Sequence, residues 1–580
     1  MASWKRRCLT SEENLDLVFE SDEDDDCDDP EFTMDIESSD SDSDNDAEAS
    51  HSEEPLDSLV PVAPPPSKAP RLDAWQWEDN DSADKVAKIP FAGTPGVKRT
   101  IQIAVGDSPT ALSMFNALLG ENFWQMLARH TNAYALEKQA SSPDPSWFPT
   151  TPGEMKAYFA LCILMSQVKK SRIQTYWSQR SVISTPFFAS VMPRQRFWPL
   201  SRYLHLCDNS LPVDDDKLRK LRPVLDYVLK VFGESYCPGE GLAVDESLMK
   251  FRGRLSYIQF NPSKRVRFRI KFYKLCESSS RYCLNFSIYT GKSERTPATA
   301  GMLCSEAVVI DLVGDRLGNG HTIYTDNWYS SPLLFFHIKE AGSNAVGTVR
   351  VHRKNMPEEL KKIKLQKGDC RSLFSRGPMA VTWRDKKPVT LLSTSHDATN
   401  LTDTGKQRKD NQPILKPQVV LDYNRGMGGV DRGDQQLASF PIMRRYAKGY
   451  KKIFYVMDIA VYNSYILCGK TTGKKSSYTG WKVDLAEQIV EETVLPGYKP
   501  RGKPTVGSLA RTTLLPTWGK ETFSERFRHH KYGVKKNDIQ ASALAEHATK
   551  EGHSASFDKR EIPGTERHWR KRLHLKSWYI

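Results

Sequence analysis

The hydrophobic period of the chain changes at Leu242, and this change limits the folds that the chain can adopt. From residue 91 to residue 240, apolar side chains recur every three or four residues, which predicts a helical region. Residues 242–249, 265–277 and 282–291 then alternate or run apolar over strand lengths, with turn-like NPSK and ESSS between them. We therefore expect a helical domain followed by a sheet.

The elements after these three strands predict an α/β layer. A helix over residues 305–320, with Ser305 as its cap, precedes a strand at 321–329, a helix at 332–341 and a strand at 345–350. Three strands, a helix, a strand, a helix and a strand is the order of an RNase H-like sheet. Parallel strands are therefore expected within this layer.

Acidic residues lie on three elements of this order. Asp245 is on the first strand, Asp326 ends the fourth strand, and Asp431 and Asp434 lie on a helix that starts near Gly429. Two-metal phosphoryl transfer needs carboxylates from separate elements, because two cations about 3.5–4 Å apart must both be ligated. Each acid also has a structural interpretation, Asp431 as a charge at a helix start and TDN as a turn. Together, in this order, the acids indicate a metal-dependent phosphoryl-transfer site.

Charge is divided unevenly along the chain. Residues 1–67 contain three Lys or Arg and 22 Asp or Glu, so they carry −19, and the remaining residues carry +31 of the total of +12. A body this basic points to a polyanionic partner, with nucleic acid ahead of an acidic membrane. The acidic segment is expected to be disordered. It is either a solvated tail that keeps the body soluble or an autoinhibitory or partner-binding segment.

Cations and aromatic rings alternate in residues 251–274, FRGRLSYIQFNPSKRVRFRIKFYK. Phosphate neutralisation uses a row of cations, and stacking on bases uses rings. The alternative is an ordinary solvated strand face, which we favour for Arg269 and Lys271 alone. The residues assigned to DNA binding are Arg252, Arg254, Lys264, Arg265, Arg267, Arg444, Arg445, Tyr450, Lys451 and Lys452.

The expected compartment is intracellular and reducing. No run of about 18 apolar residues occurs, and the first residues, MASWKRR, lack the apolar segment of a signal peptide. The ten Cys contain no CxxC pair, which is typical of reduced thiols and not of a disulfide framework or a zinc ribbon. We therefore expect a soluble protein with no membrane partner.

Several blocks of the sequence resemble the piggyBac transposase family, including its domesticated derivatives. These blocks are VDESLMKFRGR, NPSKRVRFRIKFYKLCES, YTDNWYSSPLL, GTVRVHRK, DYNRGMGGVDRGDQ, YKKIFY and NSYIL, and the resemblance covers about residues 91–500. It implies a DDE/D transposase with an α/β RNase H-like core, an inserted domain before the last acid, and a two-part helical dimerisation and DNA-binding domain. It also implies Asp245, Asp326 and Asp431 as the catalytic acids and metal ligands, and Asp434 as a fourth, supporting acid.

The family resemblance also implies a reaction and its partners. Members cut DNA by metal-assisted hydrolysis, form hairpin intermediates, and join ends at TTAA targets with excision that leaves no scar. For this chain we expect Mg²⁺ at a two-metal site, with Mn²⁺ as a substitute. The expected partners are double-stranded DNA at element ends and TTAA targets and a second copy of the chain in a homodimer, in the nucleus.

The expected domain organisation follows from these patterns together. It comprises an acidic disordered leader and Pro-rich linker (1–90), the first part of the helical domain (91–240), the first part of the core (241–350), the inserted subdomain (351–420), the second part of the core with the last acids (421–447), the second part of the helical domain (448–500), a linker (501–518) and a basic tail (519–580).

The chain departs from the family pattern in two places. Gly449 stands where members usually have Trp, and no Cys follows Cys468, so the usual Cys-rich zinc domain is missing and no zinc is expected. Residues 519–580 instead resemble the end of the GIY-YIG nuclease domain of Penelope-like elements. The GIY and YIG strands themselves are missing, and the six His of this tail show no zinc spacing, which indicates a captured, inactive basic module.

Two functions remain open from the sequence. One is a piggyBac-type transposase or domesticated derivative that cuts and transfers DNA strands, which the presence of all three acids favours. The other is a catalytically silent DNA-binding or chromatin protein on the same fold, which the missing zinc domain and Gly449 favour. A cellular nuclease on this core is a third possibility, against which the inserted domain and the flanking helices argue.

Overall fold

The described part of the chain begins at residue 75 and ends at residue 498. The computed structural model describes residues 75–79, 87–210, 212, 215–251, 255–260, 267–291, 299, 302–396, 401–407, 411, 413–442 and 453–498. All of these belong to one compact unit, Met1–Tyr498. The acidic leader, residues 443–452 with Gly449, and the 519–580 tail lie outside the described residues.

Helices fill the region between residues 99 and 235. Local signals explain where several of them begin: Thr110 and Ser113 form a capping box, and Thr151 caps a helix with Pro152 in its first turn. The helix that starts at Pro152 is buried along most of its length, as its apolar sequence predicts. The helices are α2 (Arg99–Val105), α3 (Ala111–Leu118), α4 (Glu121–Ser141), α5 (Pro152–Gln167), α6 (Pro186–Val191), α7 (Arg194–Tyr203) and α8 (Arg222–Ser235), with short 3-10 turns at Ile173–Trp177 and Ser181–Ile183.

A mixed sheet follows, with the element order predicted from the sequence. Its first part comprises β3 (Gly241–Lys250), β4 (Gln259–Phe260), β5 (Phe268–Glu277), β6 (Cys283–Ile288), α9 (Cys304–Val313), β7 (Thr322–Thr325), α10 (Pro332–Glu340) and β8 (Asn344–Thr348). β5 pairs antiparallel with both β3 and β6, whereas β3, β7 and β8 are parallel neighbours. The expected parallel strands are thus present.

Residues 351–420, expected as an inserted subdomain, lengthen this sheet. After α11 (Glu358–Lys362), the strands β9 (Cys370–Phe374), β10 (Met379–Arg384) and β11 (Pro388–Ser393) continue it, because β11 pairs antiparallel with β8. The described residues thereby form a nine-stranded sheet in the order β4-β5-β3-β7-β8-β11-β10-β9, with β6 also on β5. β12 (Leu401–Gln407) and β13 (Pro413–Pro417) form a separate hairpin.

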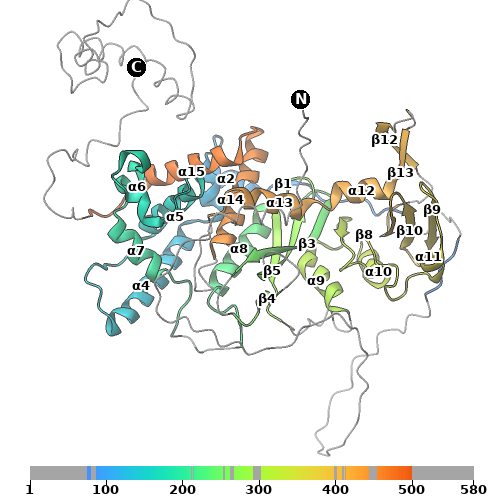
Figure 1. Ribbon diagram of the computed structural model, residues 1–580, viewed down its shortest axis with the longest axis horizontal. Coiled ribbons are helices and arrows are strands. Elements are labelled where there is room, and N and C mark those ends of the chain that lie inside the picture. The colour runs from blue at the N-terminus through green and yellow to red at the C-terminus, as the bar shows by residue number, and fades with distance from the viewer. Residues whose placement is uncertain are drawn as a thin grey trace, which may run out of the picture. The chain divides into compact units, whose positions relative to one another are not determined.

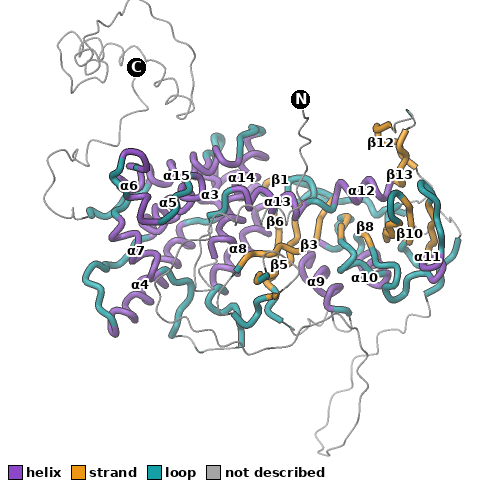
Figure 2. The backbone as a smooth tube through the Cα atoms, viewed as in Figure 1, coloured by secondary structure: helices purple, strands orange, loops and turns teal. Residues whose placement is uncertain are grey.

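Helices cover both faces of the sheet (Figures 1 and 2). α12 (Gln418–Gly426) and α13 (Gly429–Ser439) contact β3, and α9 contacts β5. The last two helices, α14 (Ile453–Thr472) and α15 (Tyr478–Glu492), pack against α3 and α5, so the last helices of the described chain complete its first helical region (Figure 1). No helix in the described ranges is both long enough and apolar enough to span a membrane.

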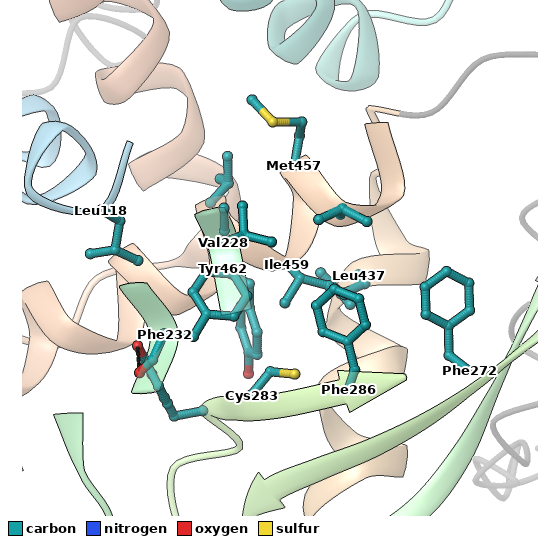
Figure 3. Packing of buried hydrophobic residues seen from close by; sticks show 14 of the residues in the cluster. Leu118, Val228, Phe232, Phe272, Cys283, Phe286, Leu437, Met457, Ile459 and Tyr462 are labelled. Atoms are coloured by element: carbon teal, nitrogen blue, oxygen red, sulfur yellow. Dashed lines mark hydrogen bonds between the residues drawn. The ribbon is translucent and has the colours of Figure 1, made fainter. Parts of the chain in front are cut away.

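One large apolar core joins the helices to the sheet. Figure 3 shows Phe272 and Phe286 on the sheet facing Leu437 of α13 and Ile459 of α14, with Phe232 of α8 nearby. These side chains are all buried. Burial of this kind is the main favourable term in folding, and here it holds α13 and α14 against the sheet.

Two expected boundaries were wrong. The strand predicted over residues 321–329 is β7, which ends at Thr325. The helix predicted over residues 305–320 is α9, which begins at Cys304 and ends at Val313, before Gly314 with its positive φ of 52°. Ser305 therefore lies inside the helix and does not cap it. Its hydroxyl instead accepts a hydrogen bond from Arg353 at 3.2 Å.

Candidate functional site

The parallel pairing of β3 with β7 brings Asp245 and Asp326 to the same level. Val244 on β3 pairs with Thr325 on β7, so the next residue of each strand is Asp245 and Asp326. β7 ends at Thr325, whereas β3 continues to Lys250 along β5. An opening at the carboxyl ends of neighbouring strands is where open α/β sheets bind their ligands.

Asp431 reaches this place from the helix α13. It is exposed in the first turn of that helix, which packs on β3. Gly429 lies so close to β3 that an added Cβ would meet the Cβ of Ala243 at 3.2 Å. Since Ala243 and Asp245 point to the same face of their strand, α13 begins over the face that carries Asp245.

The negative charges of these acids act on one another. Burial and then the charge of Asp431 hold the pKa of Asp245 well above its usual range, and Glu246 and Asp326 raise it further. A backbone N–H partly offsets this, because the amide of Glu246 donates to Asp245 Oδ1 at 2.8 Å. The Asp245 carboxylate is therefore held at a place where a positive charge would be favourable.

The donor set at this place fits a hard divalent cation. Carboxylate oxygens from Asp245, Asp326 and Asp431 are the ligands that Mg²⁺ prefers, and their mutual repulsion falls when a cation lies between them. Within the described ranges, no three His, Cys, Asp or Glu side chains are arranged as a finished metal cage. The charges of the three acids thus affect one another in this structure. Among the described residues they do not form a complete coordination shell.

Glu246 points to the opposite face of β3 from Asp245. Its carboxylate accepts a hydrogen bond from the Tyr329 hydroxyl at 3.2 Å and lies 3.9 Å from the Lys271 ammonium. Burial raises the pKa of Glu246, and Lys271 opposes that rise. The Lys271 ammonium also stands 4.6 Å from the centre of the Trp328 ring. Lys271 is therefore partly buried beside an acid, and the solvated strand face that we expected for it is wrong.

Asp434, the expected fourth acid, lies in a buried ion pair. Its Oδ1 is 2.7 Å from Lys274 Nζ, and its Oδ2 accepts a hydrogen bond from the Ser247 hydroxyl. Lys274 also donates to the Tyr455 hydroxyl at 2.7 Å. Lys274 is the strand partner of Asp245, so this ion pair lies directly beside the acid site. The structure thus gives Asp434 contacts that hold α13 on the sheet.

The Arg353 guanidinium is one of the groups that hold the loop after Asp326. Trp328 N donates to Asp326 Oδ1 at 2.9 Å, which fixes the carboxylate relative to its own loop. Arg353 donates to the carbonyls of Trp328 and Ser330 and to the Ser305 hydroxyl. One side chain therefore ties the loop that carries Asp326 to α9.

Only one of the residues assigned to DNA binding can be placed within the described ranges. Arg267, just before β5, is exposed, as a phosphate contact requires. Arg269, two residues further, is 6% exposed, so the solvated face expected for it is wrong. The other assigned residues lie outside the described ranges: Arg252, Arg254, Lys264, Arg265, Arg444, Arg445, Tyr450, Lys451 and Lys452.

Sequence reasoning did not single out several residues of this site. Lys274 was grouped with the basic strand, although its place opposite Asp245 in a hairpin register could have suggested a shared face. Arg353 and Tyr423 lie in the GTVRVHRK and DYNRGMGGVDRGDQ blocks, but those blocks do not indicate what either side chain contacts. Tyr423 lies eight residues before Asp431 on the preceding helix, where periodicity alone does not say which face meets the sheet.

Comparisons with known proteins agree on one family. A family model described as Transposase IS4 matches residues 110–465. The Homo sapiens PiggyBac transposable element-derived protein 3 is 26% identical over 424 residues, which cover 70% of this chain and 68% of that protein. The Homo sapiens PiggyBac transposable element-derived protein 2 is 25% identical over 368 residues, which cover 61% of each chain.

A solved structure shares the fold. It is the cryo-EM structure of a piggyBac transposase synaptic complex with hairpin DNA, matched with a TM-score of 0.62 and 24% identity over 82% of this chain and 90% of that one. The mixed sheet with helices on both faces accordingly fits the fold of DDE-type transposases. Because the transposase family model covers more than half of the sequence and both relatives are named as PiggyBac-derived proteins, the chain belongs to the piggyBac family of transposases and transposase-derived proteins.

Proposed function

We propose that this chain is a piggyBac-type DNA transposase, or a domesticated derivative, that cuts and joins DNA strands at TTAA sites. Its catalytic acids are Asp245, Asp326 and Asp431, with Mg²⁺, or Mn²⁺ in its place, as the metal. The observation that carries the proposal is the parallel register of β3 and β7, which brings Asp245 and Asp326 to the same level. Asp431 is near enough to raise the pKa of Asp245.

Each group of residues has a part in this reaction. Asp245, Asp326 and Asp431 would hold the metal, which when bound neutralises the charge of the scissile phosphate and helps to activate the attacking oxygen. Water attacks phosphorus, a P–O bond forms, and the bond to the 3′ oxygen breaks to release a 3′-hydroxyl. That hydroxyl then attacks a second phosphodiester, so the number of phosphodiester bonds is conserved in the joining step.

The remaining residues position these acids. The Lys274–Asp434 pair holds α13, and with it Asp431, on the sheet. Arg353 holds the loop of Asp326. A rigid arrangement of this kind matters because misplacement of a metal ligand by about 1 Å can cost about 100-fold in rate.

The proposed partners follow from charge and from the structural neighbour. Outside its first 67 residues the chain is strongly basic, and exposed Arg267 precedes β5. The matched piggyBac structure is a synaptic complex with hairpin DNA. We therefore assign double-stranded DNA as the partner, a homodimer as the working form and the nucleus as the site of action, with zinc not required.

A second function is a DNA-binding protein that no longer cuts. The two Homo sapiens relatives are named as transposable element-derived proteins. Such a protein would bind duplex DNA through the same basic surface and would leave it intact.

One assay separates the two functions. The substrate is a duplex closed by a TTAA hairpin and built on the genomic sequence that borders the gene. We expect the full chain to open the hairpin in Mg²⁺. Asp245→Asn, Asp326→Asn and Asp431→Asn should each abolish opening while DNA binding persists, since each removes a metal ligand and no phosphate contact. The matched control is Asp107→Asn, an exposed acid outside the site.

The outcomes are distinct. Binding without opening by the wild-type chain would favour the silent protein. An Asp→Asn variant that opens the hairpin at the wild-type rate would remove that residue from the site. The genomic borders add an independent check, because inverted repeats next to TTAA indicate a mobile element and their absence from an intact gene indicates domestication.

A further inference from the structure

Tyr423 on α12 lies next to the proposed catalytic acids and has no part in the metal site. Its hydroxyl shares a hydrogen bond of 3.3 Å with the Thr348 hydroxyl at the end of β8. α12 immediately precedes α13, so Tyr423 and Asp431 lie on consecutive helices that are joined by a short connection.

The strand register places Thr348 in line with two of the acids. Thr325 on β7 pairs with Val244 on β3 and with Gly347 on β8, all in parallel. The next residue on each strand is Asp245, Asp326 or Thr348. These three residues therefore lie at one level across the parallel strands, where β7 and β8 end beside β3, and Tyr423 contacts Thr348 at the end of that row.

The three acids also act electrostatically on the phenol. Burial raises the pKa of Tyr423 to about 12, with further contributions from Asp326, Asp245 and Asp431. All three proposed metal ligands are thus near enough for their charges to affect this hydroxyl. At neutral pH the phenol keeps its proton, so it can donate a hydrogen bond where the neighbouring carboxylates can only accept.

Close packing fixes the position of this phenol. Three residues after Tyr423, Gly426 lies on the ring of Tyr324, where an added Cβ would meet ring carbons at 2.2–2.4 Å. On the helix surface, residues three apart lie on the same side. Tyr423 therefore stands on the sheet-facing side of α12, and the helix cannot turn without a clash at Gly426.

We propose that the Tyr423 hydroxyl, oriented by Thr348, donates a hydrogen bond to a non-bridging oxygen of the DNA phosphate that is cut. The inference rests on the proposed function. Tyr423 forms no covalent bond and transfers no proton in this role. It supplies a neutral donor at a phosphate whose charge grows in the transition state, which is where a positioned donor accelerates the reaction.

The test removes the hydroxyl and keeps the ring. Tyr423→Phe should open the TTAA hairpin about 100-fold more slowly at saturating Mg²⁺, a loss typical of a missing transition-state donor. Thr348→Val should also slow the reaction, and Thr348→Ser, which keeps the hydroxyl, should restore it. The matched control is Tyr324→Phe, since Tyr324 is also partly buried under α12 but has Asp422, Glu240 and Arg425 as its charged neighbours.

A stereospecific substrate separates direct contact from a structural effect. Sulfur accepts hydrogen bonds poorly, so one phosphorothioate isomer at the hairpin tip should slow the wild-type chain more than the other. In Tyr423→Phe this difference between isomers should shrink, because the hydrogen bond is already missing. A purely structural role would leave the difference unchanged. Thr348→Val provides the same comparison should Tyr423→Phe fail to fold.

The outcomes distinguish this inference from the function on which it rests. Wild-type and Tyr423→Phe proteins that open the hairpin equally fast would overturn the inference alone, as would equal losses in Tyr423→Phe and Tyr324→Phe. An unchanged isomer difference would overturn it as well. A wild-type chain that binds the hairpin and never opens it would overturn the proposed function together with the inference.

Discussion

Lys274 and Asp434 form a buried ion pair, 2.7 Å from Nζ to Oδ1, that joins β5 to α13 beside the proposed catalytic acids. Lys274 is 2% exposed and Asp434 is 5% exposed. Burial alone would lower the pKa of Lys274, but the Asp434 carboxylate, together with Tyr455, Cys283 and Cys276, raises that pKa above its usual value. The largest contribution to keeping the lysine charged thus comes from an acid on the helix that carries Asp431.

Removal of one partner of this pair should be costly. We expect Asp434→Asn to lower the free energy of unfolding by about 3–5 kcal/mol, because Lys274 would remain buried without its counter-charge. The double variant Lys274→Met, Asp434→Leu should recover part of that loss. Denaturant titration measures both. Asp431→Asn, on the exposed side of the same helix, is the matched control, and an equal loss in that variant would contradict the interpretation.

Divalent metal should stabilise the fold through the proposed catalytic acids. A cation that binds the folded state raises the melting temperature, and the repulsion on Asp245 gives the site its affinity. We expect Mg²⁺ to raise the melting temperature of the wild-type chain and EDTA to reverse the rise. Asp245→Asn, Asp326→Asn and Asp431→Asn should show a smaller rise. The acidic leader is present in all variants, so an equal rise in every one would assign the effect to the leader.

Even the conservative substitution Arg353→Lys should lower both the stability of the fold and the rate of hairpin opening. Its guanidinium donates to two carbonyls and to the Ser305 hydroxyl at once, and an ammonium cannot reproduce this planar geometry. We expect Arg353→Lys to lose about 1.5–3 kcal/mol of unfolding free energy, the range for a hydrogen bond to a charged group. It should also slow hairpin opening, because the Asp326 loop loosens. Arg350→Lys, an exposed neighbour, should be neutral in both measurements.

The order of the core elements along the chain, and the element on which each acid lies, could be predicted because they follow from local patterns. Period-two alternation marks strands and period 3.6 marks helices, so the core elements were expected in the correct order. Asp326 stands just after its strand, and the parallel register brings it level with Asp245. Local sequence therefore indicated the element on which each acid lies, and their common role in catalysis stays a prediction.

The interior contacts could not be predicted, because they depend on which face each element buries. Alternation in β5 separates two faces, but it does not reveal that α13 covers the one with Lys274 and places an acid there. For the same reason Arg269 and Lys271 were expected in solvent. The extension of the sheet by β9, β10 and β11 depends on the pairing of β11 with β8, a long-range contact with no local signature.

The stability of the fold should fall in mild acid, in part through His321. This side chain is 4% exposed, its Nδ1 lies 3.0 Å from the Gly239 carbonyl oxygen, and its ring packs on Phe91. Burial lowers its pKa below the usual value. A depressed folded pKa gives stability that is present above the unfolded pKa and is lost as the pH falls through the folded one.

The comparison with a variant isolates this contribution. From about pH 7 to about pH 5, the unfolding free energy of the wild-type chain should fall more than that of His321→Gln, which keeps a donor and does not titrate. Denaturant titration at each pH measures the difference. Parallel pH curves for the two proteins would show that His321 does not contribute.

The acidic leader should weaken DNA binding by competing with phosphate. Residues 1–67 carry −19, and the rest of the chain carries +31. A leader that occupies basic side chains must be displaced before DNA binds, so fewer counterions are released in total. Deletion of residues 1–67 should therefore tighten binding to non-specific duplex and steepen its salt dependence, as measured by fluorescence anisotropy over a salt series.

A leader of equal length with Asn and Gln in place of its acids should behave like the deletion, because charge and not length causes the competition. Unchanged affinity at low salt in both proteins would leave the leader with a role in solubility alone.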